Sequence, residues 1–465
     1  MNKLPFNALA AFCILVHLSS CAPLGDNYVK PTLKLPDLNA ESSAINPQWW
    51  TLYGDAELNR LLALSVQNNS EIKLAVARIE EADAVLKQVG ATLFPDVSIN
   101  ANTSQYQVTE RGPLPLLNGA PVRRNNTAVG LGASFEIDFW GKLRRAKEAA
   151  RALALSSRFA KDTVDLSLKG LVASNYMALR SLQWQLDIVQ HNLDSRRKTV
   201  ALTQQRVQGG IASGLDLNQA EAAYQQLRAQ RADLERQVAT LEHGLVILSG
   251  DLTTRIAKPS QLALPEAPLP PAGLSSALLD ARPDLKAAEQ TLIAMNANMG
   301  IAKANLYPSI TLTAGLGAES SDLSNILDSS ARTWNIGSSL YLPVFNSGRL
   351  AARVDAASAQ KKQALAQYEA AVQRAFRETL DALVNLRQQA DRATALAAAR
   401  NAASQALVIA KNRYQYGYVS FLEVLDAERV YNDAALSYVQ SQEARLEASI
   451  SLFKALGGGW VERAH

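Results

Sequence analysis

Side chains that could carry out chemistry are few in this sequence, and they form no recognisable catalytic set. The four histidines are His17, His191, His243 and His465. They are scattered along the chain, so neither a histidine-based metal site nor a catalytic triad is expected. Gly130-Leu131-Gly132 and Gly315-Leu316-Gly317 lie inside alternating segments and lack the third glycine of a nucleotide-binding loop. The sequence therefore predicts a protein that is not an enzyme and holds no metal and no cofactor.

The thiol of Cys21 stands in a more informative context. Met1-Asn2-Lys3 is a short positive start, and Leu4–Leu18 is a mostly apolar stretch of the size of a secretory signal. The stretch ends in Leu18-Ser19-Ser20-Cys21, which resembles a bacterial lipobox, where the signal is cleaved before the cysteine and the cysteine is acylated. In such lipoproteins Ala22, in place of Asp, implies sorting to the outer membrane. An ordinary signal peptide with a chance cysteine is the alternative.

The composition favours long helices over a thick globular core. The chain has 465 residues, of which 48% are hydrophobic and only 6% aromatic, and Ala, Gln and Leu dominate. Its formal net charge is +4, with Lys and Arg interleaved with Asp and Glu. Nothing resembles a nucleic-acid-binding tract, so no nucleic-acid partner is expected.

The chain contains an internal repeat. Arg206–Glu221 matches Arg413–Glu428 at an offset of 207 residues, and Ala91–Pro95 matches Ala304–Pro308 at an offset of 213. Each copy therefore reads as a helix, a strand, a loop, a strand, a very long helix, a tight turn and a helix.

Four segments alternate apolar with small or polar residues over the length of a membrane-crossing strand. They are roughly Val97–Val108, Ala128–Phe139, Ile310–Glu319 and Thr333–Leu342. Four strands cannot close a barrel, and open edges in lipid leave backbone groups unpaired at a cost of several kcal/mol each. We therefore expect other copies of the chain to complete the sheet. Two copies would give eight strands with an interior largely filled by side chains, whereas three give a twelve-stranded barrel with an open lumen, so a trimer is favoured.

Two proline-free segments predict very long helices. Lys142 to about Val207 would extend roughly 100 Å at 1.5 Å per residue, and its counterpart runs from about Arg349 to Arg413. Return helices are expected at about Asp216–Leu248 and Phe421–Leu456. Shorter helices are expected to begin near Asp55 and at Pro283.

These elements predict a division of the chain into six segments. They are a signal peptide (1–20), a lipidated extended segment (21–55), the first repeat (56–258), a Pro-rich connector (259–280), the second repeat (281–457) and a C-terminal tail (458–465).

Several motifs together carry a family resemblance. They are the lipobox at Cys21, Trp49-Trp50 with Tyr53-Gly54-Asp55, Asp138-Phe139-Trp140-Gly141, Arg282-Pro283-Asp284, the strand starts Leu93-Phe94-Pro95 and Leu306-Tyr307-Pro308, and two Gly-x-x-Ser turns. The chain resembles the TolC-type outer-membrane efflux ducts, in particular the lipoprotein branch (NodT-like factors) that serves resistance-nodulation-division (RND) pumps.

The resemblance implies an α+β membrane protein that works as a homotrimer. A twelve-stranded β-barrel in the outer membrane would continue into a long α-helical coiled-coil barrel in the periplasm, surrounded by an equatorial region. The duct would dock on a periplasmic adaptor (a membrane fusion protein) and give passive exit to drugs or toxic small molecules from an inner-membrane RND pump. Besides outer-membrane lipid, the covalent lipid on Cys21 is the only non-protein group implied.

The resemblance also implies two groups of site residues. The turns Gly210-Ile211-Ala212-Ser213 and Gly417-Tyr418-Val419-Ser420 would lie at the periplasmic tip, where the adaptor docks. Leu422, Asp426 and Arg429 share one helical face by their spacing, and in the resembling ducts that face lines the closed tip. We hypothesise that they form a periplasmic gate. Plain turn residues and an ordinary surface ion pair are the alternatives.

Two rival functions remain open from the sequence. A soluble periplasmic coiled-coil adaptor would need no barrel, and a type I secretion duct would share the fold but export proteins. The lipobox and the pump-branch motifs favour export of small molecules. Only four methionines are present, Met1, Met177, Met295 and Met299, which disfavours a dedicated copper duct.

Overall fold

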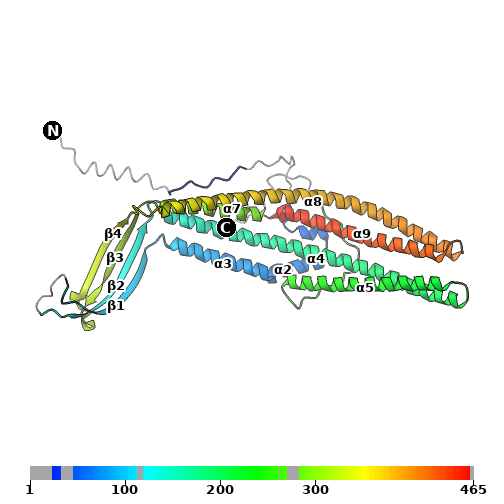
Figure 1. Cartoon of the computed structure of the whole chain (residues 1–465), viewed down its shortest axis with the longest axis horizontal. Helices are drawn as coiled ribbons and strands as arrows, with labels where there is room; N and C mark the ends of the chain where they lie inside the picture. Colours follow the sequence, from blue (N-terminus) through cyan, green and yellow to red (C-terminus); the bar gives the residue numbers. More distant parts are fainter. Residues whose placement is uncertain (1–22, 33–44, 113–118, 260, 270–281, 461–465) are drawn as a thin grey trace. The chain divides into compact units, whose positions relative to one another are not determined.

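The computed structural model describes residues 23–32, 45–112, 119–259, 261–269 and 282–460. Its described part is mostly helical and contains a four-stranded sheet (Figure 1), which confirms the expected combination of long helices with four strands in each chain. The chain divides into two compact units. The first comprises Met1–Thr32, Ile79–Ser157 and Ala288–Tyr368, and the second Leu33–Arg78, Arg158–Ala287 and Glu369–His465. Each unit draws on both sequence repeats.

The sheet belongs to the first unit and is antiparallel, in the order β1-β2-β3-β4. Its strands are β1 (Asp96–Gln107), β2 (Arg123–Ile137), β3 (Ser309–Ser320) and β4 (Arg332–Tyr341). All four expected strands are present, and β2 begins somewhat earlier than expected. The turns η3 (Leu323–Asn325) and η4 (Ser329–Ala331) lie between β3 and β4. Among the described residues, β1 and β4 form the two edges, and neither pairs with a further strand.

The register gathers the apolar side chains on one face of the sheet. Leu131 of β2 lies opposite Ile99 of β1 and Leu316 of β3, and Leu316 lies opposite Trp334 of β4. Because side chains alternate along a strand, the residues two positions away repeat the pattern and the small or polar residues share the other face. Trp334 and Ile336 are 76% and 81% exposed. The sheet thus presents an extended uncovered apolar face, which is typical of a surface that lipid or a partner covers.

The change from strand to helix after β2 is fixed by Asp138. Its carboxylate accepts hydrogen bonds from the backbone N–H of Leu143 at 2.9 Å and of Arg144 at 3.0 Å. These N–H groups belong to the first turn of a helix, where no backbone acceptor is available within the helix. Gly141 adopts φ 74°, which lets the chain turn between the strand and the helix.

A long helix follows each pair of strands, and a tight turn connects it to a shorter return helix (Figure 1). They are α4 (Lys142–Gln208) with α5 (Gly214–Ser249), and α8 (Arg349–Gln415) with α9 (Phe421–Ala455). Both α4 and α8 contain 67 residues and begin 207 positions apart, so the repeat is preserved along their whole length. Within the described ranges, no helix combines the length and apolar character needed to cross a membrane.

A hydrophobic core cluster of the described residues lies in the second unit and includes Trp49. This residue is fully buried in η2 (Trp49–Tyr53), and its ring stacks on Phe453 of α9 with a centroid distance of 5.3 Å. The Tyr53 hydroxyl donates to Ser449 Oγ at 3.0 Å, and burial raises the pKa of Tyr53 well above its usual range. The short turn η5 (Gly457–Gly459) follows α9 and closes the described C-terminal end.

The first repeat opens with two helices where the sequence analysis expected one. Helix α2 (Ala56–Asn68) ends at Asn69, and α3 (Ser70–Ala91) starts directly after it. The Asn69 side chain accepts from the backbone N–H of Glu71 at 2.8 Å and donates to the Leu248 carbonyl at 3.0 Å. Asn69 therefore caps α3 and ties the break to the end of α5. Helix α7 (Pro283–Ala304) begins at Pro283, as expected.

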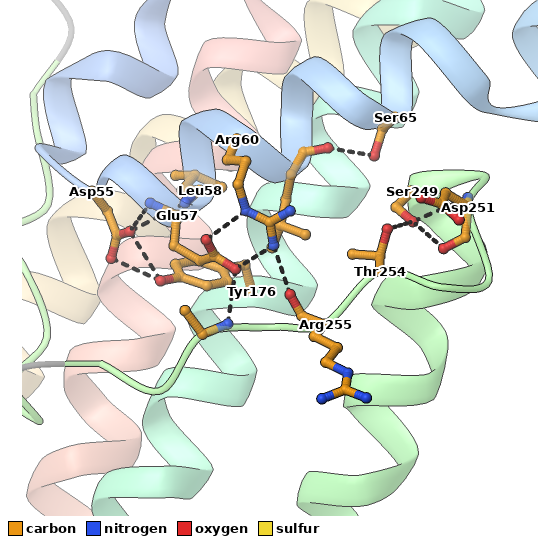
Figure 2. A network of polar contacts seen from close by, with 12 residues as sticks. Asp55, Glu57, Leu58, Arg60, Ser65, Tyr176, Ser249, Asp251, Thr254 and Arg255 are labelled. Carbon is orange, nitrogen blue, oxygen red and sulfur yellow. Dashed lines mark hydrogen bonds and ion pairs between the residues drawn. The ribbon is translucent and has the colours of Figure 1, made fainter.

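A buried polar network holds α2 against α4 (Figure 2). Asp55 caps α2 through the N–H groups of Glu57 and Leu58, and it accepts from the Tyr176 hydroxyl at 2.9 Å. Arg180 of α4 donates to Asp55 at 2.6 Å. Burial raises the pKa of Tyr176 to about 12, so its hydroxyl stays a donor at neutral pH. The expected helix start at Asp55 is thus also a long-range contact.

Candidate functional site

The two helix–helix turns that the sequence analysis singled out have the same backbone geometry. Gly210 has φ 72° and Gly417 has φ 78°, in the left-handed region that favours glycine. In the first turn, the N–H of Ile211 donates to the Arg206 carbonyl at 2.8 Å, and that of Tyr418 makes the equivalent bond to Arg413 at 2.9 Å. Both are Schellman-type ends that satisfy the last carbonyls of the long helices.

The serines that follow these turns differ from each other. Ser213 accepts from the N–H of Asp216 at 3.2 Å, and Asp216 accepts in return from the N–H of Ser213 at 3.2 Å, which is a capping box at the start of α5. Ser420 occupies the same place before α9 but makes no side-chain capping bond. The first turn is therefore closed by a capping box, whereas the second is spanned by the Arg413–Glu423 ion pair at 3.4 Å and by the Tyr414–Phe421 ring contact.

Leu422, Asp426 and Arg429 of α9 line one surface groove of about 610 Å³, which we call the tip groove. Leu422 is 58% exposed. Arg429 donates to Asp426 Oδ1 at 2.7 Å, and this bond raises the pKa of Arg429, while Asp433 lies 3.7 Å from the same guanidinium. The structure thus brings the three predicted gate residues together on one exposed face.

The tip groove is also lined by an ion cluster that the sequence analysis missed. Glu428 Oε2 lies 3.0 Å from Arg196 Nη1 of α4, and its Oε1 lies 2.9 Å from Lys411 Nζ of α8. The Arg196 and Glu428 side chains are 8% and 11% exposed. Burial lowers the pKa of Arg196, and the charge of Glu428 opposes that shift. One carboxylate of the second hairpin therefore binds the first hairpin as well as its own.

Further polar contacts join the two hairpins. Arg206 donates to the Tyr414 hydroxyl at 2.8 Å, and the Asn192 amide donates to Asn432 at 2.6 Å. Further from the turns, the Gln440 amide donates to Gln185 at 3.2 Å. These contacts fix how the two hairpins lie against each other over several turns of helix. The one signal in the sequence was the match of Glu428 with Glu221 between the repeats, which gave no indication of the partner.

The other predicted site residues lie on the two hairpins or outside the described part of the chain. Gly210 and Ser213 lie on the first hairpin, and Gly417 and Ser420 on the second. Cys21, the predicted lipid attachment residue, lies outside the described residues. Within the described part of the chain, His, Cys, Asp and Glu side chains form no group that could hold a metal ion.

Comparisons with known proteins bear directly on this architecture. The family model described as outer membrane efflux protein matches residues 61–251 and 274–458. The cation efflux system protein CusC of Escherichia coli K12 is 32% identical over 464 residues, which cover 97% of this chain and 99% of the relative. The toluene efflux pump outer membrane protein TtgI of Pseudomonas putida is 30% identical over 470 residues, with 98% of each chain covered.

Solved structures are similar over nearly the whole chain. The Campylobacter jejuni CmeC outer membrane channel superposes with a TM-score of 0.87 at 26% identity, covering 94% of this chain and 95% of that one. The open state of the Neisseria gonorrhoeae MtrE outer membrane channel gives 0.84 at 29% identity, covering 94% and 99%.

Proposed function

Because the chain belongs to the outer membrane efflux protein family, we propose that three copies of it build one exit duct that receives solutes from a periplasmic adaptor and an inner-membrane RND pump. The chain is an outer-membrane channel component of a tripartite efflux system. The observation that carries the trimer is the open sheet, whose edges β1 and β4 are unpaired among the described residues and whose apolar face is uncovered. In lipid, such edges must find partners on other copies.

We assign the two turns and the tip groove to different tasks in this duct. The turns at Gly210 and Gly417 leave Ile211 and Tyr418 exposed, which suits the docking of an adaptor helix pair near Ser213 and Ser420. The tip groove carries the exposed Leu422 and the Asp426–Arg429 pair, and three copies would bring three such groups around one axis. This arrangement supports a narrow, charged constriction at the periplasmic entrance.

The covalent lipid on Cys21 is also part of the proposal. Several acyl chains, each contributing about 0.8 kcal/mol per buried methylene, would hold the mature N-terminus at the membrane. Intact mass spectrometry of the purified protein checks this, because acylation adds the mass of the fatty acids to a chain that begins at Cys21. An unmodified N-terminus, or cleavage at another position, would remove the lipid from the proposal.

The substrates proposed are small solutes. The relatives are named for efflux of cations and of toluene, so their names favour small solutes over proteins without choosing a class. Of the described methionines, Met177 and Met299 are buried, which is unsuited to a thioether path for copper. The expectation against a dedicated copper duct therefore stays a prediction.

Complementation combined with native mass tests the proposed function. The chain would be expressed in a strain that lacks its own efflux ducts, together with a cognate adaptor and pump, and toxic compounds, copper and silver would be assayed. We expect restored resistance to small organic solutes and a trimer by native mass spectrometry in detergent. A protein that is monomeric in water without detergent would overturn the proposal.

A further inference from the structure

The segment that follows the proposed lipid site, Pro23–Tyr28, is docked on the first unit, and we call it the N-terminal strap. The N–H of Leu24 donates to the Trp140 carbonyl at 3.0 Å. Asn296 of α7 donates to the Asp26 carbonyl at 2.9 Å, and the Tyr28 hydroxyl donates to Glu289 at 3.2 Å. The strap is therefore held at three of its six residues, by the turn before α4 and by α7.

Arg145 of α4 makes most of the side-chain contacts to the strap. Its guanidinium donates to the Leu24 carbonyl at 3.3 Å, to the Gly25 carbonyl at 2.8 Å and to Asn27 Oδ1 at 2.9 Å. A fourth contact, to Glu148 at 2.7 Å, balances its charge. The Arg145 side chain is only 4% exposed. Buried arginines require this degree of satisfaction, so loss of the strap would leave its donors unpaired.

Two glycines make room for the strap. A β-carbon at Gly141 would lie 2.5 Å from the Pro23 Cα atom, and one at Gly300 would lie 2.8 Å from the Leu24 carbonyl oxygen. Neither distance is compatible with van der Waals contact. Gly300 lies inside α7, where glycine destabilises a helix by about 1 kcal/mol relative to alanine. A glycine at this position is thus costly for the helix and necessary for the strap.

The docked strap begins at a cluster of aromatic side chains at the end of the sheet. The Trp140 indole donates to the Pro308 carbonyl at 2.8 Å, and its ring lies 4.7 Å from Tyr307 and 5.0 Å from Phe139. Trp and Tyr gather at the boundary between lipid and water in barrels. Cys21 precedes Pro23 by two residues, which is at most about 7 Å of extended chain.

We infer that α7 and the start of α4 form a receptor surface for the residues that follow the lipid, and that this surface fixes the acylated N-terminus at the membrane boundary of the sheet. The inference rests on the proposed acylation of Cys21. Arg145 is the positioning residue, and Gly141 and Gly300 are the residues that let the strap approach. The acylated residue then has a fixed position relative to the strands. If the strap were unbound, the acyl chains could enter the bilayer anywhere within the length of the free segment.

Limited proteolysis of the full-length protein in detergent tests the docking. We expect chymotrypsin to cleave after Tyr28 only when the strap leaves α7 and the start of α4, and the released fragment then spans residues 21–28. The variant is Gly300→Ala, and the matched control is Gly90→Ala in α3, where a β-carbon meets only a lysine side-chain atom at 3.9 Å. We expect cleavage of Gly300→Ala at least tenfold faster than wild type, with Gly90→Ala unchanged.

A second variant and the fragment mass separate the possible failures. Arg145→Lys keeps the charge but cannot reach three acceptors, so it should also release the strap, while the trimer remains intact by native mass. Equal cleavage rates in wild type, Gly300→Ala and Arg145→Lys would overturn the inference. A fragment without acyl chains, released at the expected relative rates, would instead refute the proposed lipid. The contacts of the strap would then hold an unmodified N-terminus.

Discussion

The two hairpins of this chain have the same backbone and different ends. Helices α4 and α8 are equally long, and their turns at Gly210 and Gly417 make equivalent backbone bonds. Yet Gln219 and Ala222 occupy the positions in the first hairpin that correspond to Asp426 and Arg429 in the second. The return helix of the first hairpin begins with a capping box, whereas the second hairpin carries the exposed Asp426–Arg429 pair and the ion cluster of Glu428. A duplicated scaffold has thus kept its geometry while its two tips came to differ in chemistry.

The sharpest test of this difference uses a pair of matched glutamates. Glu428 pairs with buried Arg196 and with half-exposed Lys411, whereas its counterpart Glu221 accepts a hydrogen bond from Gln225 of the same helix on an exposed face. Removing one partner of a buried ion pair is strongly destabilising, so we expect Glu428→Gln to cost about 2–3 kcal/mol locally. Hydrogen exchange of α4 and α9 amides near the tip should rise more than tenfold, and Glu221→Gln should leave it unchanged. Similar hydrogen exchange in both variants would mean that Glu428 and Glu221 stabilise their hairpins equally.

A smaller effect is expected from the exposed groups of the tip groove. The double variant Leu422→Ala/Asp426→Ala removes the proposed constriction, while Leu215→Ala/Gln219→Ala makes the corresponding change in the first hairpin. An exposed ion pair contributes about 0–1 kcal/mol, so stability should hardly change in either case. Single-channel conductance in planar bilayers should increase only in the first variant. Conductance equal to that of wild type would contradict the gate hypothesis.

The capping serines provide a test on the scale of a single hydrogen bond. Ser213→Ala removes a capping box and should cost about 1 kcal/mol, measured as faster hydrogen exchange in the first turn of α5. Ser420→Ala removes no capping bond, so exchange at the start of α9 should stay the same. An equal increase in hydrogen exchange in the two variants would show that Ser420 caps its helix in solution.

The smallest effect concerns pH and involves His191 on α4, whose counterpart on α8 is Ala398. The Asp187 carbonyl and carboxylate raise the pKa of His191. A raised pKa in the folded state adds stability below the unfolded pKa of about 6.5, and that stability is lost as the pH rises through the folded value. His191→Gln should therefore lower the Tm by about 1 °C or less at pH 5.5 and leave it unchanged at pH 9. A larger change at pH 9 than at pH 5.5 would contradict the assignment.

Periodic features were predictable from the sequence. The alternating segments became β1 to β4, and the proline-free segments became α4 and α8, because burial on one face imposes a period of two on strands and about 3.6 on helices. The turns followed from Gly210 and Gly417. The three residues proposed for the gate lie on one face, as their spacing predicted, and their role stays a prediction.

Contacts between side chains far apart in sequence were not predictable. Glu428 and Glu221 occupy matching positions in the two repeats, and only tertiary packing brings Arg196 to Glu428. The break at Asn69 was missed although its cap to the Glu71 N–H is local, and only its second bond, to the Leu248 carbonyl, depends on tertiary packing. The strap was missed for the same reason, since Gly300 reads as an ordinary helical glycine until Leu24 lies against it.

The equal residue count of α4 and α8 constrains how such a chain can change over generations. An extra heptad in α4 alone would add about 10 Å to one member of a matched pair. Yet β2, which precedes α4, is paired in register with β3, and Arg206 near the other end is bonded to Tyr414. A one-sided insertion would have to buckle the helix or break one of those ties. We therefore expect lineages of this protein to gain or lose helical turns in α4 and α8 together, and selection to remove variants in which the two helices differ in length.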